Sequence, residues 1–410
     1  MNLAIRPILS ALVRNRTGAI LVALQIAIAL AVLVNAVFMV KQRVEKIGRP
    51  TGLDVENIFV VASTGFARDF DHSAALHEDL AYVRGIPGVI GAIATNAVPL
   101  SGGGMASGIT PRPGGSNSGY PFEWGDGNYF EVDEQGLKAL GARLVEGRYF
   151  RADEIQPAPS NPGEAGFPPG VIVTRAYAAK LFPDGHALGR TVYDFLSRPA
   201  KIIGILDTLH GSWPSLDHPD RVYLIPRLPT APRAIYLIRT EPGRRDAIMR
   251  QVEEHLSASN ARRAIRWVRS LADFKAESYL RDHNMGIFLI TVTTLLLAIS
   301  ALGIFGLATF NVNTRTRQIG TRRAVGARRF DIVSYFMTEN WLITSCGVLL
   351  GCVLALGVGY WLSQQYKLPR LDLYYLIGGV LGLWVLGLLA AWQPARRAAR
   401  ISPAVATRTV

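Results

Sequence analysis

The residues best placed for charge-based chemistry are six arginines in one short stretch, RTRQIGTRRAVGARRFD, at residues 315–331. They are Arg315, Arg317, Arg322, Arg323, Arg328 and Arg329, and the first acid is Asp331. Guanidinium groups bind phosphate oxygens, so the stretch can contact lipid headgroups. Gly320 and Gly326 divide a short helical pattern with few apolar positions. This pattern predicts an amphipathic helix along a membrane surface.

Two uncharged runs flank the arginines and determine where they lie. Residues 284–314 and 340–366 contain no charged side chain. Each run exceeds the ~20 residues that a membrane-crossing helix needs. Short loops rich in Lys and Arg stay on the cytoplasmic side of a membrane. The sequence therefore predicts a cytoplasmic loop at residues 311–331 between two spans.

The pattern Arg-x-Arg-x-Ile-Gly-x-Arg-Arg-Ala-x-Gly-Ala at residues 315–327 resembles the cytoplasmic loop of FtsX/MacB-type ABC transporter permeases. In that family the loop is a coupling helix that docks onto an ATPase subunit. The family usually has Glu at the position of Gln318. A basic loop that only fixes topology and touches headgroups is the alternative. The resemblance implies an ATPase contact through Arg315, Arg317, Gln318, Ile319, Gly320, Arg322, Arg323 and Gly326.

Composition predicts a membrane anchor joined to a water-soluble domain. The 410 residues are 49% hydrophobic, with a mean hydropathy of +0.21 and a formal charge of +13. Residues 41–284 are nearly balanced, with 29 Lys and Arg against 28 Asp and Glu. Nucleic-acid binding needs a basic face on the folded domain, so this balance argues against it. Both cysteines, Cys346 and Cys352, lie in a predicted span, so the large domain is expected to fold without disulfides.

Four spans are predicted, at residues 17–40, 285–312, 341–362 and 373–392. The first is 24 residues without a charge and ends in no small-residue cleavage site, which favours an uncleaved anchor over a signal peptide. Residues 1–16 predict a short interfacial helix. Small residues four apart permit close helix packing. These residues are Ala23, Ala27 and Ala31, Gly347 and Gly351, and Gly378 and Gly382.

The charge distribution predicts the orientation. The N-terminus, the 311–331 loop and the tail carry thirteen arginines, opposed by Asp331 and Glu339. Both termini are therefore expected in the cytoplasm of a multi-pass inner-membrane protein. The expected fold is α-helical with four transmembrane helices, plus a mixed α/β extracytoplasmic domain between helices 1 and 2. The expected domains are residues 1–40, 41–284 and 285–410.

The large domain shows short apolar runs typical of strands and longer periodic runs typical of helices. Strands are predicted at residues 57–62, 171–174, 201–206, 223–225 and 234–239. Helices are predicted at 72–84, 175–181 and 245–257, the second capped by Thr174. Residues 101–119 and 156–170 predict flexible loops. Residues 171–192 and 201–212 resemble the MacB-type extracytoplasmic core domain.

Motifs for catalysis or nucleotide binding are missing from the sequence. It contains no G-x-x-x-x-G-K-[ST], H-E-x-x-H or G-x-S-x-G pattern. Two groups of potential metal ligands are better explained as solvated surfaces: Asp69, Asp71, His72, His77 and Glu78, and His210, Asp217, His218 and Asp220. A basic run at residues 262–269 is expected to be an exposed face balanced by nearby acids, with headgroup binding as the alternative.

The resemblance implies a non-catalytic permease subunit without a cofactor of its own, whose partner ATPase binds ATP and Mg²⁺. It implies a homodimer or a heterodimer with a paralogous permease, with a periplasmic adaptor and an outer-membrane channel as further candidate partners. The subunit would couple ATP hydrolysis to an extracytoplasmic change that exports or extracts a substrate. A membrane-anchored sensor or regulator of an extracytoplasmic partner is the alternative.

Overall fold

The computed structural model describes residues 16–114, 119, 126–157, 166–229, 233–366 and 371–402. The chain divides into two compact units. A helical unit combines Met1–Lys46 with Asp282–Val410, and a sheet unit comprises Ile47–Arg281. The predicted interfacial helix at residues 1–16 lies outside the described residues except for Arg16, and so does the end of the tail.

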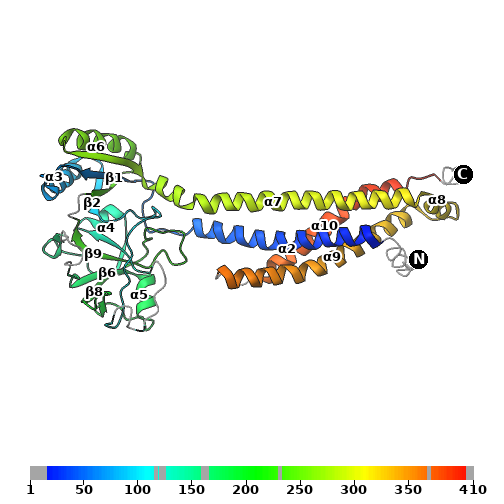
Figure 1. Cartoon of the computed structure of the whole chain (residues 1–410), viewed down its shortest axis with the longest axis horizontal. Helices are drawn as coiled ribbons and strands as arrows, with labels where there is room; N and C mark the ends of the chain where they lie inside the picture. The colour runs from blue at the N-terminus through cyan, green and yellow to red at the C-terminus, as the bar shows by residue number, and fades with distance from the viewer. Residues whose placement is uncertain are drawn as a thin grey trace. The chain divides into compact units, whose positions relative to one another are not determined.

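The helical unit is built on four long helices (Figure 1). They are α2 (Arg16–Ile47), α7 (Leu271–Thr314), α9 (Arg329–Tyr366) and α10 (Leu373–Ala398). Each is long and apolar enough to cross a membrane. Helices α2 and α7 extend beyond the predicted spans because the charged segments that adjoin their apolar runs also have good helix propensity. The first eleven residues of α7 consequently belong to the sheet unit.

Small residues set how closely α9 approaches α2. A Cβ atom built on Gly347 would lie 2.7 Å from the carbonyl oxygen of Ala23. A Cβ on Gly351 would lie 3.1 Å from the Cα of Ala27. Ala31 is also buried on α2. A larger side chain at either glycine would therefore push the two helices apart.

On α10 the predicted glycine pair does not make the contact within this chain. Gly378 and Gly382 are exposed, and no neighbouring atom lies within 4 Å of a Cβ built on either. Gly379 is buried instead, and its built Cβ would lie 2.6 Å from Val34 Cγ2. The buried face of α10 includes Gly379, Leu383, Gly387 and Ala391. Its first two residues each follow a glycine of the predicted pair by one position.

Buried amides add directional contacts between these helices. Asn35 Nδ2 donates to Ala31 O at 2.9 Å, within α2, and to Ala355 O of α9 at 3.2 Å. The Asn35 amide thus bonds both to the backbone of its own helix and to that of a neighbouring helix. Asn340 Nδ2 of α9 donates to Gly387 O of α10 at 2.9 Å. Such bonds fix helix rotation in surroundings without water.

The first layer of the sheet unit is a four-stranded antiparallel sheet in the order β11-β1-β10-β2. Its elements are β1 (Ile58–Gly65), α3 (His72–Gly85), β2 (Val89–Thr95), β10 (Arg233–Thr240), α6 (Arg245–Ser259) and β11 (Arg263–Ser270). This order is the ferredoxin-like arrangement of two interleaved β-α-β units. Phe59 and Val61 point to one face with residues of α3 and α6, while Ile58 and Val60 point to the other.

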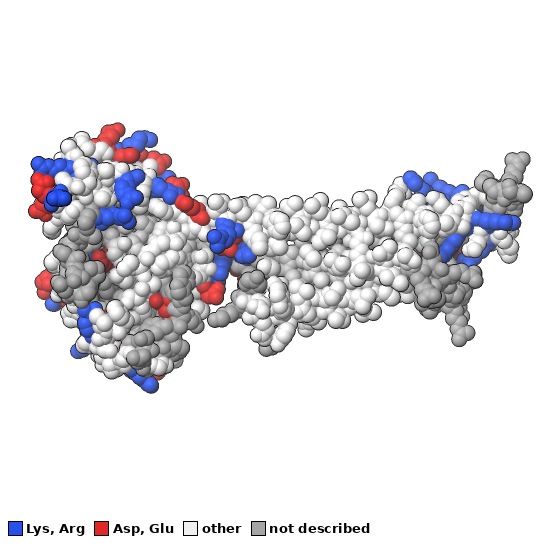
Figure 2. All heavy atoms as spheres, in the orientation of Figure 1, with Lys and Arg blue, Asp and Glu red and all other residues white. Residues whose placement is uncertain are grey.

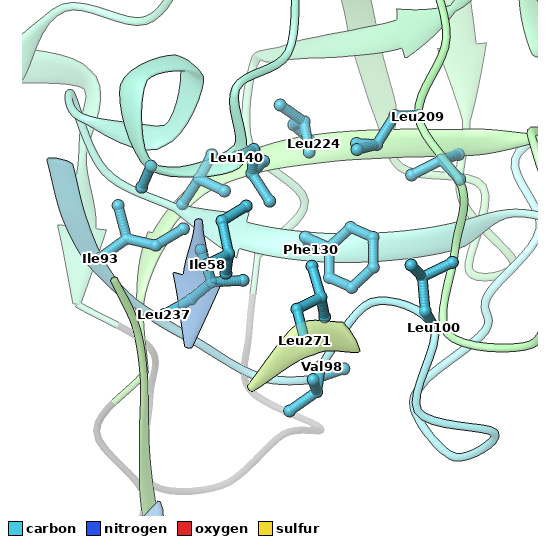
Figure 3. Close-up of a cluster of buried hydrophobic side chains, with 14 of the residues drawn as sticks. Ile58, Ile93, Val98, Leu100, Phe130, Leu140, Leu209, Leu224, Leu237 and Leu271 are labelled. Atoms are coloured by element: carbon cyan, nitrogen blue, oxygen red, sulfur yellow. The ribbon is translucent and has the colours of Figure 1, made fainter. Parts of the chain in front are cut away.

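The second layer is inserted between β2 and β10 and contains a mixed sheet in the order β3-β9-β6-β8-β4. Its elements are β3 (Asn128–Val132), α4 (Gly136–Leu140), β4 (Leu144–Gly147), η2 (Ala152–Glu154), β5 (Gln156–Pro157), β6 (Gly170–Thr174), α5 (Arg175–Leu181), β7 (Thr191–Tyr193), β8 (Pro199–Leu206) and β9 (Val222–Leu228). Strand β6 alternates between two cores, with Ile172 in one and Val171 and Val173 in the other. Figure 3 shows the core that joins the two layers, with Phe130 and Leu237 among its side chains.

The predicted strands correspond to β1, β6, β8, β9 and β10, the first starting one residue too early, and the predicted helices fall within α3, α5 and α6. Strands β2, β3, β4, β5, β7 and β11 were not predicted, and β5 lies at the start of the predicted loop at residues 156–170. The cap assigned to Thr174 is wrong: its side chain makes no capping bond to α5. Its hydroxyl instead bonds across the sheet to the backbone of Asp220 and Val222, which leaves the oxygen turned away from the helix.

The prediction of an exposed basic face at residues 262–269 holds for Arg262 and Arg266 but is wrong for Arg263, which is buried. Its guanidinium forms an ion pair with Asp79 of α3, and its Nε donates to Leu256 O at 2.9 Å. The two side chains are 2% and 5% exposed. Tyr236 OH donates to the same carboxylate at 2.5 Å, and burial beside Asp79 raises the pKa of this phenol far above its usual value. The network ties α3 to β10 and β11.

We predict that Arg263→Met lowers the free energy of unfolding of the sheet unit by about 3–5 kcal/mol, because Asp79 would remain buried without its cation. Hydrogen exchange of the sheet-unit amides in the full chain measures this loss. Combining Arg263→Met with Asp79→Leu should restore most of the stability. An equal loss in the single and double variants would contradict the prediction.

One loop after β8 holds both segments that connect the sheet unit to the rest of the chain. The His210 backbone N–H donates to Thr51 O at 2.9 Å, and Arg49 Nη1 donates to Asp217 O at 3.0 Å. Tyr279 OH of α7 donates to Pro214 O of the same loop at 3.1 Å. His210 itself is 2% exposed, and this burial lowers the pKa of its imidazole to about 4.

We predict that acid weakens the sheet unit through His210. An unfolded histidine has a pKa of about 6.5, so between about pH 4 and 6.5 the unfolded state binds more protons and stability rises with pH. Lowering the pH from 7 to 4.5 should cost the folded unit about 2 kcal/mol through this group. His210→Gln should remove that part of the pH dependence of hydrogen exchange. An unchanged pH dependence in this variant would refute the assignment.

Candidate functional site

The arginine-rich stretch folds as a short helix, α8 (Thr316–Ala324), between α7 and α9. Ile319 and Gly320 are its buried residues. Ile319 belongs to a small apolar core with Val312 of α7, Ile332 and Phe336 of α9, and Ala395 and Ala398 of α10. The one strongly apolar side chain on its buried face therefore fixes α8 against three long helices.

Hydrogen bonds stabilise the turn after α8 at both of its ends. Gly326 has φ +101°, and the N–H groups of Gly326 and Ala327 donate to Arg323 O and Arg322 O at 3.2 and 3.0 Å. This is a Schellman motif, which requires a left-handed residue after the helix. At the start of α9 the Asp331 carboxylate accepts from Arg328 N at 2.9 Å, as an acid in a first helical turn does.

Three arginines of the stretch bind within the helical unit; we call them the tethering arginines. Arg315 Nη1 lies 3.0 Å from Glu339 Oε2 of α9, with side chains 16% and 3% exposed. Arg323 Nη1 donates to Ala399 O, just past α10, at 2.5 Å. The Arg322 guanidinium lies over the Tyr335 ring, 4.8 Å from its centroid. Together they attach α8 to α9 and to the end of α10.

The remaining side chains form an exposed surface, which we call the loop face. It comprises Arg317, Gln318, Val325, Arg328, Arg329 and Phe330. Val325 and Phe330 are 85% and 78% exposed, which is unusual for large apolar side chains among charges. Figure 2 shows Lys and Arg gathered at the end of the helical unit that carries α8, beyond a long uncharged helix surface.

The eight residues that the sequence pattern assigned to one ATPase contact therefore have different places in the structure. Arg317 and Gln318 lie on the loop face, Arg315 and Arg323 are turned inward, and Ile319 is in the core. Arg322 is exposed but stacked, Gly320 is buried and Gly326 shapes the turn. The sequence prediction missed Val325 and Phe330, whose apolar character within a charged loop was an available signal. It also missed Glu339 as a partner.

Of the two groups of potential metal ligands, the one at residues 69–78 is mostly exposed, as predicted. The prediction of a solvated surface is wrong for His210 of the second group, which is 2% exposed because its loop packs against the segment at Thr51. Asp71 caps α3 by accepting from Ser73 N and Ala74 N, and Asp69 pairs with Arg262 at 2.6 Å. His77 Nδ1 lies 2.7 Å from Ser73 O. In the part of the chain that the structure describes, no three His, Cys, Asp or Glu side chains are placed to hold a metal ion.

Comparison with protein families decides the identity of the chain. The FtsX-like permease C-terminal model matches residues 290–403, and the MacB-like periplasmic core domain model matches residues 18–265. The chain belongs to the MacB/FtsX-like family of ABC transporter permeases. Helix α8 lies within the first match and the sheet unit almost wholly within the second.

Individual relatives are distant and mostly longer. The macrolide export ATP-binding/permease protein MacB of Nitrosomonas europaea is 28% identical over 64% of this chain and 40% of its own length. The pyoverdine export protein PvdT of Pseudomonas syringae is 25% identical over 72% and 42%. The uncharacterized ABC transporter permease YvrN of Bacillus subtilis is 23% identical over 72% and 71%. The chain thus spans about two fifths of the length of the MacB relatives.

The periplasmic region of MacB from Actinobacillus actinomycetemcomitans covers 55% of this chain and 94% of its own, at 13% identity and a TM-score of 0.34. An overlap this low adds nothing to the family assignment.

We predict that Gly326→Ala speeds hydrogen exchange of the Gly326 and Ala327 amides about fivefold, because a Cβ in the left-handed region costs roughly 1 kcal/mol. No neighbouring atom lies within 4 Å of that Cβ, so the cost is in the backbone. Gly306→Ala is the matched control, since Gly306 is equally uncrowded but has no positive φ. Equal exchange in both variants would contradict the role of the turn.

Proposed function

We propose that this chain is the permease subunit of an ABC transporter and couples ATP hydrolysis to a conformational change in its sheet unit. The ATPase that binds ATP and Mg²⁺ would lie outside these 410 residues and dock on the loop face. The observation that carries the proposal is this surface: exposed arginines together with exposed Val325 and Phe330, on α8, the turn after it and the start of α9. Helix α8 is fixed to three long helices through Ile319. Membership of the ABC transporter permease family supports an ABC ATPase as the partner.

In this proposal the four long helices cross the bacterial inner membrane, with both termini and α8 in the cytoplasm and the sheet unit outside. The excess of arginine in the predicted cytoplasmic segments supports this orientation, because Arg-rich short loops are retained inside. The near neutrality of residues 41–284 agrees with a domain that is moved across the membrane.

Helix α7 is the direct covalent connection for the coupling. Its first turn contributes Leu271 and Phe274 to the core shared by the two sheet layers. Ser278 Oγ on the same helix donates to Leu100 O at 2.5 Å. The other end of α7 leads into α8. Since a helix resists compression along its axis, displacement of α8 by the ATPase would reach the sheet unit through α7.

The proposed assembly contains two such permeases, identical or paralogous, and two ATPases. A periplasmic adaptor and an outer-membrane channel are further candidate partners. The relatives named for macrolide export and pyoverdine export support export or extraction of a substrate on the outer side. The work would then be done by the sheet unit.

We predict that Arg328→Glu combined with Arg329→Glu abolishes co-purification of an ABC ATPase with the tagged full chain from its native membranes. Reversing two charges on the loop face replaces attraction by repulsion toward an acidic partner surface. The fold should survive, because acidic side chains are favourable at the N-terminus of α9.

The matched control is Arg250→Glu with Arg266→Glu, two exposed arginines of the sheet unit. This variant should retain the ATPase. Undiminished ATPase recovery with the Arg328/Arg329 variant would refute docking on the loop face.

A further inference from the structure

The ion pair between Arg315 and Glu339 differs from the exposed arginines of the loop in its position and its burial. Arg315 is the residue between α7 and α8, and Glu339 lies three turns into α9. Their side chains are 16% and 3% exposed, whereas Arg317, Arg328 and Arg329 are exposed. The pair therefore connects the α7–α8 junction to the interior of the helical unit.

A purely topological role does not account for Glu339. An arginine at the membrane surface is solvated by water and headgroup phosphates and needs no carboxylate. A carboxylate that is only 3% exposed is costly unless it is paired, so burial of Glu339 points to a specific contact. Glu339 Oε2 has Arg315 as its partner, while Oε1 is buried without a hydrogen-bond partner among the described residues.

Two further contacts also attach α8 to the neighbouring helices. Arg323 donates to Ala399 O beyond α10, and Arg322 stacks on Tyr335 of α9. Helix α8 is consequently held to α9 and to the end of α10 by its own charged side chains. A displacement of α8 must move those helices or break the contacts.

We propose that Arg315 and Glu339 are positioning residues that transmit movement of α8 into α9, and that the tethering arginines serve transmission while the loop face serves docking. This inference rests on the proposed function. It assigns Arg315 and Arg323 away from the ATPase contact that the sequence pattern suggests.

The test compares Arg315→Met, Glu339→Leu and the double variant in the full chain. Each single change leaves one buried charge without its partner and is expected to destabilise the helical unit. The double change removes both charges, so stability should return. If the pair were merely structural, the double variant would regain ATP-dependent coupling together with stability. If the pair transmits movement, the double variant would regain stability alone.

Two readouts are taken on each variant in lipid nanodiscs with the ABC ATPase that co-purifies with the wild-type chain. The first is recovery of that ATPase. The second is the change in hydrogen exchange of β1 and of the first turns of α7 when ATP and Mg²⁺ are added. The control removes the exposed Lys41–Glu45 pair, 55% exposed on both sides, by Lys41→Gln with Glu45→Gln.

We expect the double variant to bind the ATPase within about twofold of wild type and to lose the ATP-dependent exchange change, which the control keeps. Retention of the exchange change, or loss of ATPase binding, would overturn the inference. The proposed function fails separately, if no ABC ATPase co-purifies with the wild-type chain or if the Arg328/Arg329 variant still binds it.

Discussion

The structure depends on one constraint, which is the apolar surface of the four long helices among the described residues. The apolar windows of these helices carry at most two charged residues each, and the arginines of the helical unit collect near the helix ends. Between the helices, directional polar contacts are made by buried amides, such as Asn35 to Ala355 O. Glycine and alanine make the remaining contacts close enough to hold the helices together.

The same constraint divides the six arginines of the loop. The two that point inward need partners, and Arg315 and Arg323 have a carboxylate and a carbonyl. Arg322 is exposed and lies over the Tyr335 ring. Those that point outward are solvated and stay available to another molecule. The sheet unit differs, because its apolar side chains are buried in cores of its own. It combines a ferredoxin-like layer and an inserted mixed sheet that share one core.

Much of this organisation can be predicted from the sequence. Apolar run lengths predict the helices and the pattern at residues 315–327 indicates the loop, because both depend on local composition. The faces of α10 could not be predicted, since Gly378 and Gly379 differ only in which neighbour the helix rotation brings near. Arg263 was misassigned because its partner Asp79 lies 184 residues away in sequence. The Arg315–Glu339 pair was missed for a related reason, as the two residues lie on different helices.

The loop at residues 210–217 has a consequence for how such proteins diversify. Arg49 and Tyr279 both bond to this loop, at carbonyls only a few residues apart, so the entry and exit of the sheet unit lie close together. A domain with adjacent ends can be inserted into a host chain or replaced without stretching the host. The four long helices can thus keep their packing while the sheet unit between them is exchanged for one of a different size.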